Sequence, residues 1–381
     1  MIESISIKNF KSVVDLKLDL GQFNVLIGEN GCGKSNILEG IAFGAAASVN
    51  KLDREFFSNR GIRITDPKFM YSVFNEESNP VIEIDIKDTK SGIFDKRFEL
   101  KYNAELKPAR WEDLSILNRF ARMLSGESKA MDDTVLSYDD FNLIMNRFQH
   151  RFDPIVLSGK DAISFHDYLI FSLEESILRK YDAENAIHPL GRNGEGLFAY
   201  LKEISQREDG LDILKEIKEN LYILDWFDDL EIPKDQLSNE FSLQVKDKYV
   251  NDTLRFFDQR STNEGFLYLL FYLTLFISDE TPSFFAIDNL ESSFNPKLCR
   301  EITKRLIQLA KKHDKQVIVT THSPAILDGL DITDNDERLF VIRRNMDGYT
   351  KANRVEYKTS MTVPLSEAWT KGYIGGLPEN F

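Results

Sequence analysis

Several residue types are scarce in this sequence of 381 residues, and their scarcity excludes whole classes of protein. The two cysteines, Cys32 and Cys299, are too few for a disulfide framework or a cysteine zinc site, which fits a reducing cytoplasm. With 20 glycines and 11 prolines, the chain is neither collagenous nor of low complexity. Its 48 basic residues against 62 acidic ones give a net charge of −14, which does not draw the whole molecule to nucleic acid or anionic lipid. We therefore predict a cytoplasmic globular protein in which any contact with nucleic acid is a local patch.

Long hydrophobic runs are also missing. The longest, Phe266–Ile277, is interrupted only by Thr274 and is well short of the roughly 20 apolar residues that cross a bilayer. Near the start, Ile5 and Ile7 alternate with polar residues as in a strand, which argues against a signal peptide. We expect a buried helix at 266–277 and no membrane partner.

The patterns that are present indicate an α/β fold. Dividing the length by about 150 residues per domain gives two to three domains. A nearly continuous apolar run at 23–27 stops at Gly28, and a helical stripe rich in small residues begins near Ser35. Three further short apolar strands follow at 284–288, 316–320 and 339–342. A helical stretch separates the first two of these, as in a parallel sheet.

Two other regions complete the predicted architecture. Segments 81–86 and 97–102 alternate around a polar connection with Ser91 and Gly92, which predicts an antiparallel hairpin in an N-terminal β layer. From 104 to 238 the apolar spacing turns helical, and we predict a helical insertion there.

The segment Gly28–Ser35 has the phosphate-loop pattern of a glycine, four residues and then Gly-Lys-Ser, between a predicted strand and a predicted helix. In such a loop the glycines turn N–H groups toward phosphates, Lys34 supplies a charge to the β- and γ-oxygens, and the Ser35 hydroxyl ligates Mg²⁺. We therefore predict nucleotide binding. The residues expected around the nucleotide are Asn30, Gly31, Cys32, Gly33, Lys34, Ser35 and Asn36.

Further polar residues follow the later strands. Asp288 ends an apolar strand, where a carboxylate requires a compensating cation, so we expect Asp288 and Ser35 to hold Mg²⁺ between them. His322 follows the strand at 316–320 at the same sheet edge, and we expect it to contact the γ-phosphate. Glu291 stands three residues after Asp288, and Asn289 follows Asp288 directly.

Asn263, Glu264 and Gly265 precede the buried helix, where the free N–H groups of a helix N-terminus can bind an anion. Read alone, the tripeptide favours a plain helix cap. Its position, about twenty residues before Asp288, gives it more weight in the family pattern that follows.

Together, Gly28–Ser35, Asn263–Gly265, Asp288–Glu291 and Thr320–Pro324 resemble, in order and rough spacing, the ABC-class ATPases of the SMC, RecF and OLD type. The opening Ile5–Ser12 is similar to the first strand of that family. The chain resembles still more closely the OLD-like AAA ATPases of prokaryotic phage-defence systems. The resemblance implies an ABC-type P-loop ATPase head, with an N-terminal part at 1–103, the helical insertion at 104–238 and a C-terminal part at 239–381.

The resemblance also implies a mechanism. ATP in that family lies between two protomers, so Asn263–Gly265 would serve the nucleotide of a partner in a homodimer or higher oligomer. In phage-defence systems the ATPase works beside a separate effector, often a nuclease, which implies an antiviral role. In that family the catalytic glutamate directly follows the Walker B aspartate. Asp288 corresponds to that aspartate, and Asn289 occupies the position of the glutamate. Hydrolysis is therefore slow or uses Glu291, with Lys34 and His322 as the other catalytic residues.

Three functions stay open at this point. The first is an ATPase engine or sensor for an effector in anti-phage defence or DNA transactions. The second is an OLD-like nuclease with metal ligands in the acidic cluster at 331–337; we interpret that cluster as a solvated turn, because too little chain follows it for a further domain. The third is a nucleotide-gated scaffold with little hydrolysis, which Asn289 favours. The basic stretch at 304–315 is interpreted as the outer face of a surface helix.

Overall fold

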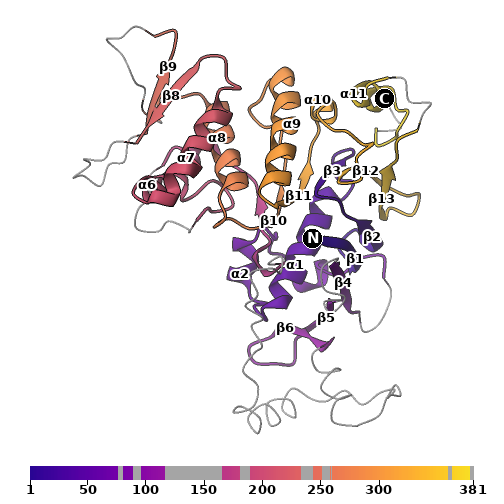
Figure 1. Ribbon diagram of the computed structural model, residues 1–381. Coiled ribbons are helices and arrows are strands. Elements are labelled where there is room, and N and C mark those ends of the chain that lie inside the picture. Colours follow the sequence, from indigo (N-terminus) through magenta and orange to yellow (C-terminus); the bar gives the residue numbers. More distant parts are fainter. Residues whose placement is uncertain are drawn as a thin grey trace.

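Two β-sheets with helices packed on them organise the molecule, and the mixed α/β fold that we predict is confirmed (Figure 1). The computed structural model describes residues 1–75, 80–88, 96–115, 165–180, 189–232, 243–250, 258, 260–358 and 363–377.

The central sheet has six strands in the order β13-β12-β3-β11-β10-β7. They are β3 (Phe23–Ile27), β7 (Ile170–Phe171), β10 (Phe284–Ile287), β11 (Gln316–Thr320), β12 (Glu337–Arg344) and β13 (Thr350–Val355). All neighbouring pairs are parallel except β12 and β13, which are antiparallel. The four strands that the sequence predicts for this sheet are confirmed. Because β3, β11 and β10 are adjacent and parallel, their carboxyl ends meet at one edge.

The second sheet is antiparallel, in the order β2-β1-β4-β5-β6. Its strands are β1 (Ile2–Phe10), β2 (Val13–Asp19), β4 (Ile82–Asp88), β5 (Lys96–Asn103) and β6 (Arg110–Asp113). The pairing of β4 with β5 confirms the predicted hairpin, and its connection at Ser91 and Gly92 lies outside the described residues.

Helix α1 (Lys34–Ser48) packs between the two sheets and is buried over most of its length. Its small residues allow this close packing. A Cβ on Gly40 would lie 3.0 Å from Cδ1 of Ile7 in β1, and a Cβ on Gly44 would lie 2.9 Å from Cγ2 of Ile84 in β4. Both contacts are with the antiparallel sheet, so glycines in α1 allow this sheet to approach the helix that carries the phosphate-loop lysine.

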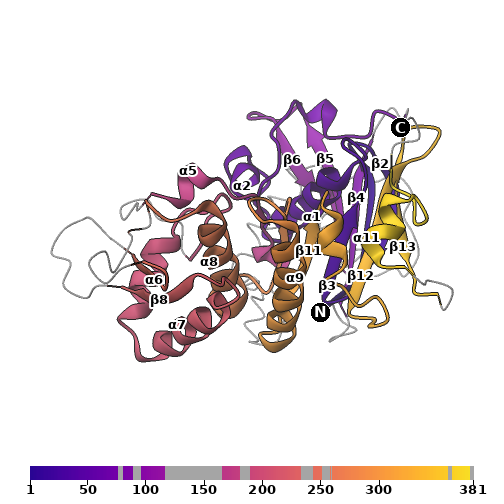
Figure 2. The same ribbon diagram turned by 90° about the horizontal axis from the view of Figure 1, so that it is seen from above.

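The other face of the central sheet carries a second core built around α8 (Glu264–Ile277), which is buried from Phe266 onward as predicted. Helix α7 (Glu208–Leu221) packs against α6 (Leu197–Ser205) and α8, and α8 packs against α9 (Pro296–Lys312). Figure 2 shows α6 and α7 on the side of α8 away from the central sheet. The remaining elements are α2 (Arg54–Asn59), α5 (Glu175–Leu178), α10 (Pro324–Leu327), α11 (Leu365–Thr370), β8 (Phe227–Glu231), β9 (Gln244–Asp247) and the single turns η1 (Pro67–Phe69) and η2 (Phe165–Asp167).

The interval 104–238, which we predict as a helical insertion, is only partly described. Its described part contains α6 and α7, but it also supplies β6 to the antiparallel sheet and β7 to the central sheet. The helical spacing expected at 114–124 and 141–148 lies outside the described residues, except for positions 114 and 115. The boundaries of the insertion stay a prediction. Among the described residues, no helix is long and apolar enough to span a membrane.

Gln316, the first residue of β11, connects the two sheets and provides a test of the fold. It is fully buried; its Oε1 accepts the N–H of Ile2 at 2.9 Å, and its Nε2 donates to the carbonyl oxygens of Ile2 and Gly21 at 2.8 Å each. We expect Gln316→Leu to lower the free energy of unfolding by about 3 kcal/mol, because it leaves buried backbone groups without partners. Gln22→Leu, which removes a single bond to the Ala310 carbonyl, should cost less. Urea unfolding measures both, and equal losses would contradict this account.

Candidate nucleotide site

The phosphate loop already has a ligand-binding shape. Gly28, Gly31 and Gly33 have φ angles of 150°, 78° and 109°, which residues with a side chain rarely adopt. The Lys34 ammonium lies within the loop and donates to the carbonyl oxygens of Gly28 at 2.8 Å and Glu29 at 3.0 Å. Burial lowers the pKa of Lys34, and the charges of Asp288 and Glu291 oppose that shift. A nucleotide phosphate would therefore replace carbonyl oxygens as the acceptor of this cation.

The C-terminal strands hold the loop from one side. A Cβ on Gly28 would lie 2.1 Å from the carbonyl oxygen of Ile342 in β12. The hydroxyl of Thr350, the first residue of β13, donates to the carbonyl of Cys32 at 2.9 Å and lies 2.7 Å from Oγ of Ser12. Sequence reasoning missed Thr350, because no local pattern shows that β13 lies beside the loop.

Most of the expected site residues line one cavity of about 370 Å³. Its lining comprises Asn30, Gly31, Gly33, Lys34, Ser35, Asn36, Arg63, Asp288, Asn289, His322 and Arg344. Three expected groups are absent from this lining, namely the buried Cys32, Glu291 and Asn263–Gly265. The cavity therefore brings together residues that follow β3, β10 and β11.

Two arginines of the lining carry no sequence motif and were not anticipated. Arg63 donates from Nη2 to Oδ1 of Asn36 at 2.7 Å and also binds the buried carboxylate of Glu39. Arg344 donates from Nε to the carbonyl of Gly31 at 3.0 Å. Both place a permanent positive charge beside the loop, which suits a polyphosphate ligand.

Asp288 is held by a hydroxyl on the neighbouring strand. Thr320, fully buried at the end of β11, donates from Oγ1 to Oδ1 of Asp288 at 2.5 Å and accepts the N–H of Asn289 at 2.9 Å. Asn289 has a left-handed backbone with φ of 58°. The hydroxyl of Thr320 therefore orients the carboxylate toward the cavity.

Glu291 and His322 are also connected. The backbone N–H of His322 donates to Oε1 of Glu291 at 2.7 Å, whereas Oε2 of Glu291 is buried and has no hydrogen-bond partner. Burial, followed by the nearby Lys34 cation, lowers the pKa of His322. The imidazole that lines the cavity is therefore neutral near pH 7 and can accept a proton or a hydrogen bond.

The donors at this site fit Mg²⁺. Ser35 and Asp288 both line the cavity, and each offers an oxygen ligand. No group of three or more His, Cys, Asp or Glu side chains that could hold a metal occurs among the described residues. Mg²⁺ needs no such group, because it usually binds one or two carboxylates together with water and substrate phosphates.

The segment Asn263–Gly265, which we expect to face the nucleotide of a partner, forms the N-terminal cap and first turn of α8. Asn263 caps α8, accepting the N–H of Phe266 on Oδ1 at 2.8 Å. A Cβ on Gly265 would lie 2.9 Å from the carbonyl oxygen of Ser293, so glycine allows the loop after Asp288 to approach. Asn263 is exposed, whereas Glu264 and Gly265 at the start of α8 are half-buried.

The other charged segments have structural roles. Asp334 and Glu337 of the acidic cluster both bind Lys311, and Glu337 also accepts the N–H of Asp331. Lys315, predicted on the outer face, is instead buried and donates to backbone carbonyls near Ser278. Asp334 and Glu337 are therefore paired with a lysine, and Lys315 does not belong to an outer basic face.

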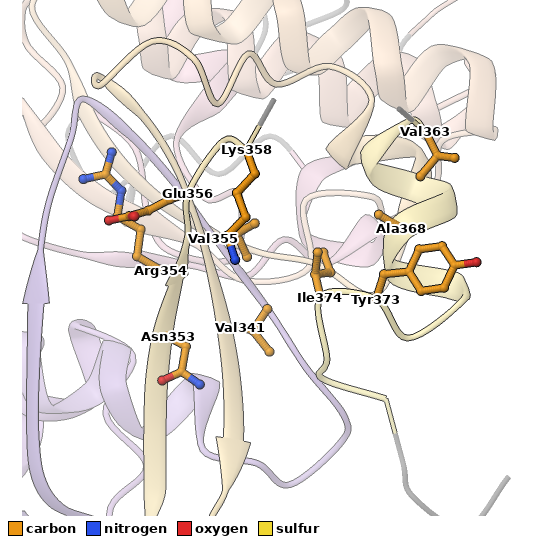
Figure 3. A pocket seen from close by; sticks show the side chains of 10 residues that line it. All are labelled: Val341, Asn353, Arg354, Val355, Glu356, Lys358, Val363, Ala368, Tyr373 and Ile374. Carbon is orange, nitrogen blue, oxygen red and sulfur yellow. The ribbon is translucent and has the colours of Figure 1, made fainter. Parts of the chain in front are cut away.

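A larger cavity of about 550 Å³ lies between the β12–β13 hairpin and the C-terminal segment (Figure 3). Its lining includes Val341, Val355 and Ile374 and contains none of the predicted site residues. It is therefore not part of the nucleotide site.

Comparison with known proteins agrees with this geometry. A family model described as "AAA domain, putative AbiEii toxin, Type IV TA system" matches residues 23–328. The chain is 38% identical over 93 residues to the uncharacterized protein MJECL10 of Methanocaldococcus jannaschii and 30% identical over 103 residues to the DNA replication and repair protein RecF of Lactococcus lactis subsp. cremoris. These matches cover 23% and 27% of this chain, and the chain spans only 41% and 28% of the two relatives.

The fold is similar to solved SMC heads. An SMC head bound to the C-winged helix domain of ScpA has a TM-score of 0.56 at 15% identity, covering 94% of this chain and 99% of that one. A head with an extended coiled coil, bound to the C-terminal domain of ScpA from Pyrococcus furiosus, has a TM-score of 0.50 at 14% identity, covering 98% of each chain. The predicted ABC-type P-loop fold is confirmed.

The contact between Thr320 and Asp288 can be tested with two variants. We expect Thr320→Val to weaken Mg²⁺-dependent nucleotide binding about tenfold, because a hydrogen bond to a charged group is lost at constant side-chain size. Thr320→Ser keeps the hydroxyl and should stay close to the unchanged protein. Nucleotide titrations with Mg²⁺ and with EDTA measure the effect; the same Mg²⁺ dependence in both variants would show that the contact has no such role.

Proposed function

This chain belongs to that AAA domain family, an ABC-class ATPase family of the SMC and RecF type, and on this premise we propose that it binds and hydrolyses ATP as the engine or sensor for a separate effector protein. The observation that carries the proposal is the single cavity lined by the phosphate loop, Asp288 and His322. The family description, which names a toxin–antitoxin system, supports a role in anti-phage defence.

Each residue has a definite task in this proposal. The backbone N–H groups of the loop and the Lys34 ammonium bind the phosphates, with Arg63 and Arg344 adding positive charge. Ser35 and Asp288 would hold Mg²⁺, which would neutralise charge on the phosphate oxygens. His322, which lines the same cavity, would contact the terminal phosphate.

Hydrolysis also requires a group that orients or deprotonates water. Asn289 lines the cavity, but an amide cannot take a proton. Glu291 can, and its unpartnered Oε2 is available once the side chain turns toward the cavity. We therefore assign the water-activating task to Glu291.

We further propose a homodimer in which Asn263–Gly265 of one copy faces the nucleotide of the other. The exposure of Asn263, the N-cap residue of α8, supports this arrangement. A separate partner protein is supported by the similar SMC heads, which were solved bound to domains of ScpA. The similarity to RecF, a DNA replication and repair protein, leaves a local DNA contact as part of the proposal.

A second candidate function is the nucleotide-gated scaffold. It is favoured by Asn289 and by the hydrogen bond that holds Glu291 to the backbone of His322 outside the cavity lining. The nuclease alternative has no comparable support, because Lys311 binds Asp334 and Glu337 of the acidic cluster.

Glu291→Gln separates these functions. It should slow phosphate release by about a hundredfold or more without lowering ATP affinity, since only the proton acceptor is lost.

Asp288→Asn should reduce both Mg²⁺-dependent binding and turnover, and Lys34→Ala should weaken binding by at least about tenfold. Single-turnover phosphate release and ATP titration measure all three. Unchanged turnover in Glu291→Gln places the base elsewhere, and negligible turnover in the unmutated protein favours the scaffold.

Gly265→Asp tests the dimer. A carboxylate at this helix start should repel the terminal phosphate bound by the partner and abolish ATP-dependent association. Gly265→Ala is the matched control, because it introduces the same Cβ contact with Ser293 without a charge. Sedimentation with and without MgATP compares them; equal association of both variants would contradict the proposed arrangement.

A further inference from the structure

A buried carboxylate on α1 takes no part in the functions assigned above. Glu39 follows Lys34 on this helix and is only 2% exposed. Its Oε2 binds the ammonium of Lys11, which lies in the turn between β1 and β2, and its Oε1 accepts the Nε–H of Arg63. A buried carboxylate is costly unless a cation compensates its charge. Two cations from different parts of the chain meet at this one carboxylate.

The charges at Glu39 do not cancel. The side chain of Lys11 is 10% exposed, and Lys11 and Glu39 form a buried ion pair that is neutral as a whole. Arg63 is the second cation; its side chain is 63% exposed and lines the nucleotide cavity. Because Lys11 already compensates the carboxylate, the charge of Arg63 remains available to an anion in that cavity.

One edge of the Arg63 guanidinium is held on α1. Its Nε binds Glu39, and its Nη2 donates to Oδ1 of Asn36 at 2.7 Å. The amide of Asn36 is oriented in turn, because its Nδ2 donates to Oγ of Ser12 at 2.7 Å. The Nη1 group of Arg63 has no hydrogen-bond partner among the residues that the structure describes. The guanidinium therefore keeps an unbound edge, and such a planar fork matches two oxygens of one phosphate.

We propose that Glu39 is a positioning residue, which holds Arg63 so that the free edge of its guanidinium binds a phosphate group of the nucleotide. The inference rests on the proposed function, since it assumes that the cavity binds ATP. Lys11 has an indirect part in the same task, because it neutralises Glu39 and leaves Arg63 its charge. The burial of Glu39 also has a reason in this account: a buried carboxylate is screened little by water and salt, so it holds the guanidinium firmly.

The sign of the effect of Glu39→Gln distinguishes positioning from simple electrostatics. Removal of a negative charge near the cavity should by itself strengthen the binding of a polyanion. Loss of positioning should instead weaken MgATP binding about tenfold, because Arg63 loses its charged partner and with it the hydrogen bonds to phosphate. Glutamine has nearly the same size and still accepts a hydrogen bond. Calorimetric titration of the full chain with MgATP measures the affinity, and urea unfolding shows whether the variant is folded.

Arg63→Gln completes a double-mutant cycle. It should also weaken MgATP binding about tenfold, and Glu39→Gln added to it should cause no further loss, because the two residues act as a unit. Glu83→Gln is the matched control. Glu83 likewise binds a lysine and an arginine, Lys8 and Arg97, but it lies in the antiparallel sheet and does not line the nucleotide cavity. Its replacement should leave the affinity for MgATP unchanged.

A second variant keeps the test valid if Glu39→Gln folds poorly. Glu39→Asp keeps the charge and the ion pair with Lys11, but its side chain is one methylene shorter and cannot contact both cations as before. It should weaken MgATP binding about threefold or more when Arg63 is present and should have no effect in Arg63→Gln.

Three outcomes would overturn the inference. If the unmutated protein binds MgATP and a folded Glu39→Gln or Glu39→Asp binds it equally well or more tightly, the inference is wrong although the proposed function stands. Losses in Glu39→Gln and Arg63→Gln that add up would assign Glu39 to the fold alone. If the unmutated protein does not bind MgATP, the proposed function fails and this inference with it.

Discussion

The parallel pairing of β3, β11 and β10 is the constraint on which the rest of the structure depends. These strands come from opposite ends of the chain, and their nearly continuous apolar residues are buried on both faces of the central sheet. Their register aligns Val25 with Val319 and Ile287 with Val319, so the three carboxyl ends stop at the same level. The phosphate loop, Asp288 and His322 are brought together by this alignment and by no local sequence contact. The hydrogen bond between Thr320 and Asp288 exists for the same reason, since it joins neighbouring strand ends.

The C-terminal part of the chain acts on the same loop from the other side. The carbonyl of Ile342 excludes any side chain at Gly28, and the hydroxyl of Thr350 binds the carbonyl of Cys32. Strands β12 and β13 therefore support the curved shape of the loop. The same contacts also make the loop a place where nucleotide binding and the position of the C-terminal segment can affect each other.

The fold and much of the site could be predicted from the sequence because their signals are local. A strand that stops at Gly28, followed by Gly-Lys-Ser and a helix, predicts the loop, and the apolar run before Asp288 predicts a strand end. Thr350, Arg63 and Arg344 could not be predicted in this way. Each reaches the site through pairing or packing between segments distant in the chain, and none stands in a recognisable motif. Strands β6 and β7 were also not predicted, because they are short and lie in an interval where the overall spacing of apolar residues is helical.

The residue after Asp288 shows how backbone geometry can change a catalytic pattern. Asn289 adopts a left-handed conformation, and its N–H binds the hydroxyl of Thr320. Asparagine tolerates this conformation better than most residues with a side chain, whereas glutamate would add strain. The backbone therefore favours asparagine at the position where similar ATPases carry a glutamate. Glu291 remains nearby, but in this structure one of its oxygens binds the N–H of His322 and the other is buried without a partner. Catalysis by Glu291 would require its side chain to release the N–H of His322, which lies on the separate loop after β11, so the rate of hydrolysis would depend on whatever moves the His322 loop. A bound nucleotide and a second copy of the chain would both contact it, which gives a physical reason for turnover to be coupled to assembly.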